Sequence, residues 1–151
     1  MVKPNIMATT NNLERFIAAQ KDDYATALAE ISQGRKRSHW MWYIFPQIQG
    51  LGFSGTAQFY AIKDLEEAGY YLAHPVLGAR LTAICEALLQ QKSNNATEIF
   101  GNPDDLKLRS SLTLFAQVQG APLIFKQVLA RFFDGQEDAK TLNILGAQNY
   151  N

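Results

Sequence analysis

The residues whose side chains are best suited to binding or catalysis lie together in the stretch from Gly34 to Gly55. Three cations, Arg35, Lys36 and Arg37, precede a histidine, two tryptophans and a tyrosine, and a glycine-rich turn follows them. Aromatic faces beside fixed cations suit the recognition of a planar, anionic compound, although the same side chains can equally form a core. The segment therefore predicts either a ligand site or the centre of the fold.

His39 is the candidate catalytic residue of this segment. Histidine is the side chain best suited to proton transfer at neutral pH, as a general acid or base. Ser38 is adjacent, but adjacent side chains diverge by about 100° on a helix and point to opposite faces of a strand. The two therefore cannot form a serine–histidine nucleophile pair. A hydrolytic or transfer step would rest on His39 alone, so the sequence leaves open whether the protein is an enzyme.

The remaining candidates are ligand-binding residues. We expect Arg35, Lys36 and Arg37 to meet an anion at the start of a helix capped by Ser38, where free backbone N–H groups also attract negative charge. We expect a ring of the ligand to meet the aromatic and polar side chains further along, which are Trp40, Trp42, Tyr43 and Gln47. A nucleotide or an ADP-ribose-like compound carries both groups.

Two other interpretations of the same segment remain open. In the first, Ser38 caps a helix, His39 bonds a backbone carbonyl, both tryptophans fill the core and the three cations form a solvated turn. In the second, the aromatic surface binds another protein or a second copy of this chain, because tryptophan, tyrosine and arginine are favoured in interface hot spots. Size-exclusion behaviour distinguishes the second interpretation from a ligand site.

The glycine-rich turn superficially matches a dinucleotide-binding fingerprint through Gly50, Gly52 and Gly55. That fingerprint needs a preceding strand within a strand–helix–strand unit, and the sequence supplies no alternating strand pattern. A flexible lid or a tight turn is therefore the favoured interpretation.

The other reactive side chains favour structural roles. His74 precedes Pro75 and is predicted to cap a helix end as a cation at a C-terminus. Cys85 lies among apolar residues, which predicts an inert buried thiol. No recognised metal-ligand spacing occurs, so we predict no metal and no cofactor. A set of polar side chains lies on an otherwise apolar helix, and it either lines the predicted ligand site or faces solvent. Its members are Lys107, Arg109, Ser110, Ser111 and Thr113.

The composition limits the classes of partner. The 151 residues carry 14 basic and 14 acidic side chains, so no global charge draws the chain to nucleic acid or anionic lipid. The one cysteine excludes an intrachain disulfide and indicates a reducing compartment. No signal-peptide pattern and no run of about 18 apolar residues occurs. We therefore expect a cytoplasmic protein without a membrane segment, with a small anionic ligand or a homo-oligomeric contact as its partner.

Apolar periodicity predicts the helices that position these residues. Two successive helices are expected over 13–31, with Asp22 or Asp23 capping the second, and one or two short ones over 56–73. Further helices are expected over 76–91, 95–100, 103–119, 123–133 and 138–145. The prediction is an all-α fold of about seven helices, several of them short, with no substantial sheet. Residues 1–10 are expected to be a flexible lead before a single helical domain at 11–151.

The run SHWMWYIFPQ at 38–47, followed by GLG at 50–52, resembles the signature of the family catalogued as domain of unknown function 1810. HPVLGARL at 74–81 and KLRSSLTLF at 107–115 fall in that family's order, and FFDGQEDAKTL follows near the end. The resemblance covers nearly the whole chain and implies a mainly α-helical domain. It implies no established activity, substrate or catalytic residue.

Overall fold

The computed structural model describes residues 3–148, with side chains from residue 12 onward. Helices are the regular elements of this range, and they confirm the all-α prediction, with nine helices there instead of about seven. They are α1 (Lys3–Ser32), α2 (Met41–Ile44), α3 (Gly55–Phe59), α4 (Leu65–Ala73), α5 (Leu77–Leu89), α6 (Ala96–Phe100), α7 (Asp104–Ala116), α8 (Ile124–Phe133) and α9 (Ala139–Gln148). Residues 3–148 contain no strand, and one isolated parallel bridge joins Ile48 to Ile62.

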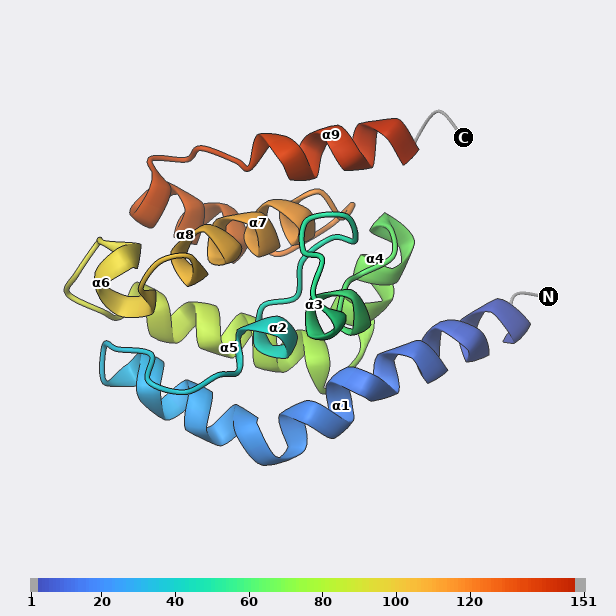
Figure 1. Ribbon diagram of the computed structural model, residues 1–151, viewed down its shortest axis with the longest axis horizontal. Coiled ribbons are helices and arrows are strands. Elements are labelled where there is room, and N and C mark those ends of the chain that lie inside the picture. Colours follow the sequence, from blue (N-terminus) through green and yellow to red (C-terminus); the bar gives the residue numbers. More distant parts are fainter. Residues whose placement is uncertain (1–2, 149–151) are drawn as a thin grey trace.

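The larger helices pack in an order that differs from their order along the chain. α1 packs on α5, α5 on α8, α8 on α7 and α7 on α9, from the lower to the upper edge of Figure 1. α2 contacts α1. Within residues 3–148 no single helix is long and apolar enough to cross a membrane. α4 and α5 together have that length and composition, but they are bent by 85° relative to each other.

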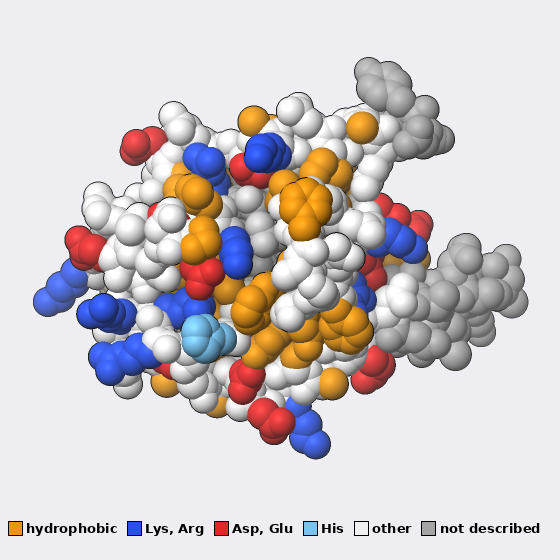
Figure 2. Space-filling model, in the orientation of Figure 1, with side chains coloured by type: hydrophobic (Ala, Val, Ile, Leu, Met, Phe, Trp, Pro, Cys, Tyr) orange, Lys and Arg blue, Asp and Glu red, His pale blue; other side chains and the backbone are white. Residues whose placement is uncertain are grey.

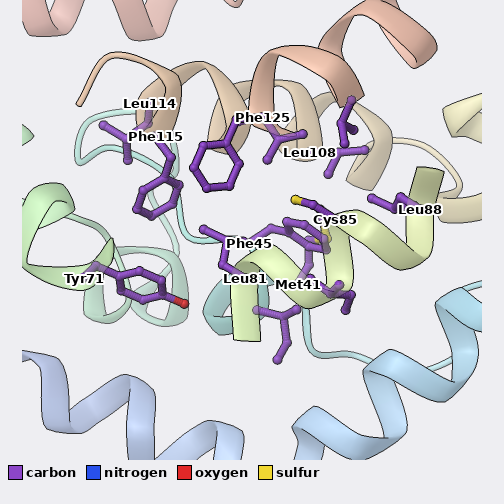
Figure 3. Close-up of a cluster of buried hydrophobic side chains, with 14 of the residues drawn as sticks. Met41, Phe45, Tyr71, Leu81, Cys85, Leu88, Leu108, Leu114, Phe115 and Phe125 are labelled. Carbon is purple, nitrogen blue, oxygen red and sulfur yellow. The ribbon is translucent and has the colours of Figure 1, made fainter. Parts of the chain in front are cut away.

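The core lies around α5, as the apolar stripe of residues 76–91 predicts. Leu81, Cys85 and Leu88 of this helix are buried, and Leu81 and Cys85 lie near aromatic side chains from the neighbouring elements (Figure 3), among them Phe45 and Phe125. Burial raises the pKa of the Cys85 thiol, so Cys85 is the unreactive buried residue that the sequence predicts.

The prediction of two successive helices near the N-terminus is wrong, because α1 continues without a break to Ser32. Asp23 does not cap a second helix, since its carboxylate accepts a hydrogen bond from the Tyr43 hydroxyl instead. α1 begins at Lys3, inside the segment 1–10 that the sequence assigns to a flexible lead. Residues 1 and 2 lie outside the described range, and the flexibility of the lead stays a prediction.

From His74 onward, the residues predicted to cap helices predict the helix ends more accurately than the apolar spacing near the N-terminus does. Asn95 accepts hydrogen bonds from the N–H groups of Thr97 and Glu98 at the start of α6, as predicted. Asp138 caps α9 by accepting from the Thr141 N–H at 3.0 Å. His74 ends α4, as predicted, and its N–H donates to the Tyr70 carbonyl at 3.0 Å. Its imidazole Nδ1 also accepts the Val76 N–H at 3.1 Å, just before α5 begins.

Candidate functional site

The segment of residues 35–40 wraps around the carboxylate of Glu30, near the end of α1. Glu30 accepts hydrogen bonds from the N–H groups of Arg37 at 2.7 Å and Ser38 at 3.0 Å, from the indole of Trp40 at 2.9 Å, and from the Ser38 hydroxyl. Burial alone would raise the pKa of this carboxyl group, but the four hydrogen bonds outweigh burial and lower the pKa to about 2. Glu30 is therefore a buried, ionised side chain with its hydrogen bonds satisfied.

Glu30 changes the predicted anion site in a specific way. The backbone N–H groups of Arg37 and Ser38 do bind an anion, as the sequence suggested, but that anion belongs to the protein itself. The prediction that Ser38 caps a helix is wrong, because its hydroxyl donates to Glu30 and α2 begins only at Met41. No local sequence pattern pairs Glu30 with this segment.

The three predicted cations do not act together. Lys36 is buried, with 7% of its side chain exposed, and its ammonium pairs with Asp104 at 2.9 Å. The same ammonium lies 4.9 Å from the centre of the Trp40 ring and donates to the Ser38 carbonyl. Arg35 and Arg37 are exposed on the surface. Lys36 therefore fixes the segment to α7.

The predicted histidine and aromatic residues also separate. Trp40 is 1% exposed and packs between Phe45 and Phe100, at ring distances of 6.3 and 6.4 Å, so it cannot stack on a ligand. The Tyr43 hydroxyl donates to Asp23, and burial, followed by this hydrogen bond, raises the pKa of Tyr43. His39 is exposed. Neither His39 nor Tyr43 lines the cleft described next.

A cleft of about 770 Å³ lies between α7, the loop of residues 51–54 and the start of α9. Trp42 and Gln47 are the two predicted site residues that line it. Figure 2 shows this face hollowed between α7 and the loop, with basic and hydrophobic side chains at its rim. Its volume falls within the range of about 300–1,000 Å³ that is typical of ligand pockets.

The glycine-rich loop forms one wall of the cleft. Gly50 has a φ of 107°, which favours glycine, so the tight turn predicted from the sequence is present. Beyond it, Phe53 is 82% exposed and lines the cleft. Ser54 caps α3 by accepting the Ala57 N–H at 3.1 Å. The dinucleotide fingerprint is excluded, because no strand precedes the loop within the described range.

The charged groups in the cleft are mostly positive. Lys107, Arg109 and Lys140 line it, against one carboxylate, that of Asp138. Lys107 lies 5.4 Å from the centre of the Trp42 ring, and Arg109 pairs with Asp138 at the long distance of 3.9 Å. Lys107, Arg109 and Ser110 line the cleft, which agrees with the first of the two interpretations of this set of polar side chains. Ser111 and Thr113 are buried instead.

Among the described residues that line the cleft, no nucleophile is paired with a base. No histidine is among the described residues that line it. Asp138 already accepts the N–H and the hydroxyl of Thr141, at 3.0 and 2.6 Å. Ser110 donates to the Leu106 carbonyl at 3.1 Å and has no base beside it among its described partners. Within residues 3–148 no three histidine, cysteine or acidic side chains gather to hold a metal ion.

These features define a helical protein with a basic, aromatic-walled cleft on one face. The family described as "Protein of unknown function (DUF1810)" matches residues 10–145, and the chain belongs to that family. The conserved hypothetical protein Rv1873 from Mycobacterium tuberculosis, known from a crystal structure, is 46% identical. The match covers 89% of this chain and 96% of that one, with a TM-score of 0.87. No curated protein matches the chain.

Proposed function

We propose that this protein binds a small ligand that joins a flat ring to an anionic group, in the cleft between α7, the 51–54 loop and α9. The observation that carries the proposal is the convergence of Trp42 with Lys107, Arg109 and Lys140 around one cavity of about 770 Å³. Nucleotides and ADP-ribose-like compounds are the first candidates, because they combine a planar base with phosphate.

The ring-binding part of the cleft is supplied by Trp42. Its indole is half-buried, so part of it remains open to the cavity, in contrast to the fully buried Trp40. Phe53 on the opposing loop adds an exposed aromatic side chain to the same lining. Aromatic side chains of this kind favour planar ligands through stacked or edge-to-face contacts.

The anion-binding part of the cleft is supplied by α7 and α9. These helices take the role that the sequence analysis predicts for Arg35, Lys36 and Arg37. Lys107 and Arg109 extend from α7, and Lys140 from the first turn of α9. Among the described residues Lys140 makes no ion pair. Positive charges in a concave site raise the local concentration of anions.

A thermal-shift screen of nucleotides, ADP-ribose-like compounds and small aromatic carboxylates tests the proposal. A ligand at 100 times its Kd stabilises the native state by roughly 2.7 kcal/mol, which corresponds to about 5–10 °C for a chain of this size. We expect the shift to persist in Arg37→Gln, whose side chain lies outside the cleft, and to be lost in Trp42→Ala and Lys107→Gln. Absence of a shift with every compound would reject the proposal.

A second candidate function is a contact with another protein or a second copy of this chain. An aromatic strip supports it, in which Tyr60 contacts Tyr43 at 5.1 Å and Phe59 at 4.8 Å, and Phe59 is 58% exposed. Exposed aromatic clusters are favoured at interfaces. Size-exclusion chromatography with light scattering tests this candidate function. We expect a dimer whose population rises with protein concentration and which Phe59→Ser abolishes. A monomer at all concentrations would contradict a homo-oligomeric contact.

A further inference from the structure

Resting on the proposed function, we infer that the anionic group of the ligand is a single phosphate monoester, held at the Arg109–Lys140 end of the cleft while the ring lies at the Trp42 end. The ligand class is then a nucleoside monophosphate or a similar compound with one ring system and one phosphate. The inference follows from the charge of the cleft, the directions of two side chains on α7 and the unused donors of Arg109.

The charge of the cleft matches a dianion. Three cations and one carboxylate line it, which leaves an excess of two positive charges. Asp104 also approaches Lys107, at 3.6 Å, but it lies closer to Lys36, at 2.9 Å, so its charge is shared between two lysines. A phosphate monoester carries about 1.5 to 2 negative charges at pH 7, whereas a carboxylate carries one.

The cations of α7 reach toward different parts of the cleft. Lys107 and Arg109 are two residues apart, so their side chains leave the helix in directions about 200° apart. Lys107 lies over the Trp42 ring, at 5.4 Å from its centre, while Arg109 approaches Asp138 next to α9. Ala139 and Lys140, the first residues of α9, also line the cavity and directly follow Asp138 in the chain. The cleft therefore has an aromatic end and a cationic end.

Arg109 keeps donors that the protein does not use. Its Nε is buried and has no hydrogen-bond acceptor among the described residues, and its Nη2 lies 3.9 Å from Asp138, too far for a hydrogen bond. Its guanidinium lies 5.9 Å from the centre of the Phe133 ring, which helps to fix its orientation. Because the Nε is enclosed, the terminal nitrogens of this planar guanidinium are the donors that a phosphate in the cleft can meet, and they suit two phosphate oxygens in a bidentate manner.

Isothermal titration calorimetry with four defined probes tests the inference. The probes are adenosine 5′-monophosphate, adenosine, adenosine 5′-diphosphate and indole-3-carboxylate, all at one salt concentration. We expect the monophosphate to bind at least about tenfold more tightly than adenosine, because hydrogen bonds to charged groups contribute roughly 1.5–3 kcal/mol. Arg109→Gln and Lys140→Gln should each weaken the monophosphate about tenfold and leave adenosine unchanged.

Matched controls separate the site from general surface charge. Arg37→Gln and Lys21→Gln remove exposed cations outside the cleft and should leave every Kd unchanged. If Arg109→Gln alters the fold, as judged by circular dichroism and Tm, the exposed Lys140 still supplies the test.

The outcomes distinguish this inference from the proposed function. The phosphate assignment is overturned if adenosine binds as tightly as its monophosphate, if the diphosphate or indole-3-carboxylate binds more tightly, or if both cleft variants bind the monophosphate like the wild type. If Trp42→Ala still abolishes binding of the preferred probe in those cases, the proposed function stands. Failure of all four probes to bind would overturn both.

Discussion

The indole Nε1 of Trp40 donates a 2.9 Å hydrogen bond to the carboxylate of Glu30, which lies ten residues earlier on α1. This bond holds Trp40 inside the protein, and Trp42, two residues further on, lies at the cleft. The two tryptophans of one motif therefore lie in different places: Trp40 fixes the segment to the core, and Trp42 lines the cleft.

Replacement of Glu30 by glutamine should destabilise the fold and change its response to acid. The folded pKa of about 2 lies below the roughly 4.3 of an unfolded glutamate, which corresponds to on the order of 3 kcal/mol. Because the folded pKa is depressed, this contribution is complete above about pH 4.3 and is lost as the pH falls toward 2. Urea unfolding at pH 7, 4 and 3 measures it.

The difference between wild type and Glu30→Gln isolates this one carboxyl group from the other acidic residues. It should be largest at pH 7 and shrink steadily below pH 4. Glu14→Gln, at an exposed site on the same helix, is the matched control and should leave the unfolding free energy nearly unchanged. A constant difference between wild type and Glu30→Gln at all three pH values would contradict the ionised state assigned to Glu30.

The tryptophan variants should separate stability from binding. Trp40→Ala removes a fully buried indole and should cost roughly 3–5 kcal/mol, because the cavity it leaves is large. Trp42→Ala removes a half-buried indole at the cleft and should cost about 1 kcal/mol while abolishing ligand binding. Chemical denaturation and calorimetry on both variants check the pair. Equal losses of stability would show that Trp42 is also a core residue.

Most of the fold could be predicted from the sequence because its signals are local. The spacing of apolar residues predicts α5 and α8. Asn95 caps α6, and Asp138 caps α9. The helix break predicted near Asp23 is wrong for a physical reason. The Asp23 carboxylate accepts a hydrogen bond from the Tyr43 hydroxyl, 20 residues further along the chain, instead of capping a helix.

The candidate site was harder to predict because long-range pairs define it. Trp42, Gln47, Lys107 and Arg109 line the cleft, and a ligand-binding role for Trp42 and Gln47 stays a prediction. Lys140 was missed, although it lies within the stretch FFDGQEDAKTL that carries the family resemblance. The cations next to Trp40 looked like an anion site, and only the structure shows Lys36 bonded to Asp104 and the nearby N–H groups bonded to Glu30.

His39→Ala should leave both stability and ligand binding almost unchanged. The imidazole is exposed, does not line the cleft and makes no side-chain hydrogen bond to another described residue. Substitutions at such positions change the unfolding free energy by no more than about 0.5 kcal/mol. Thermal unfolding and titration with adenosine 5′-monophosphate measure the two effects. A loss of binding in this variant would restore His39 as a site residue and place the ligand outside the cleft.

Lys36→Met should weaken anion binding in the cleft even though Lys36 does not line it. Asp104 lies between Lys36 and Lys107, so removal of the Lys36 charge leaves the carboxylate to neutralise Lys107 alone. Methionine retains an apolar side chain of similar length over the Trp40 ring, which limits the loss of packing.

The Kd of adenosine 5′-monophosphate should rise severalfold in Lys36→Met, and the Kd of adenosine should not change. The double variant Lys36→Met with Asp104→Asn removes the carboxylate as well and should recover most of the lost affinity, because Lys107 then has no competing anion. Recovery separates an electrostatic effect through Asp104 from a distorted fold, which the second substitution would not repair. An equal loss of affinity in the single and double variants would show that Asp104 does not modulate the charge of Lys107.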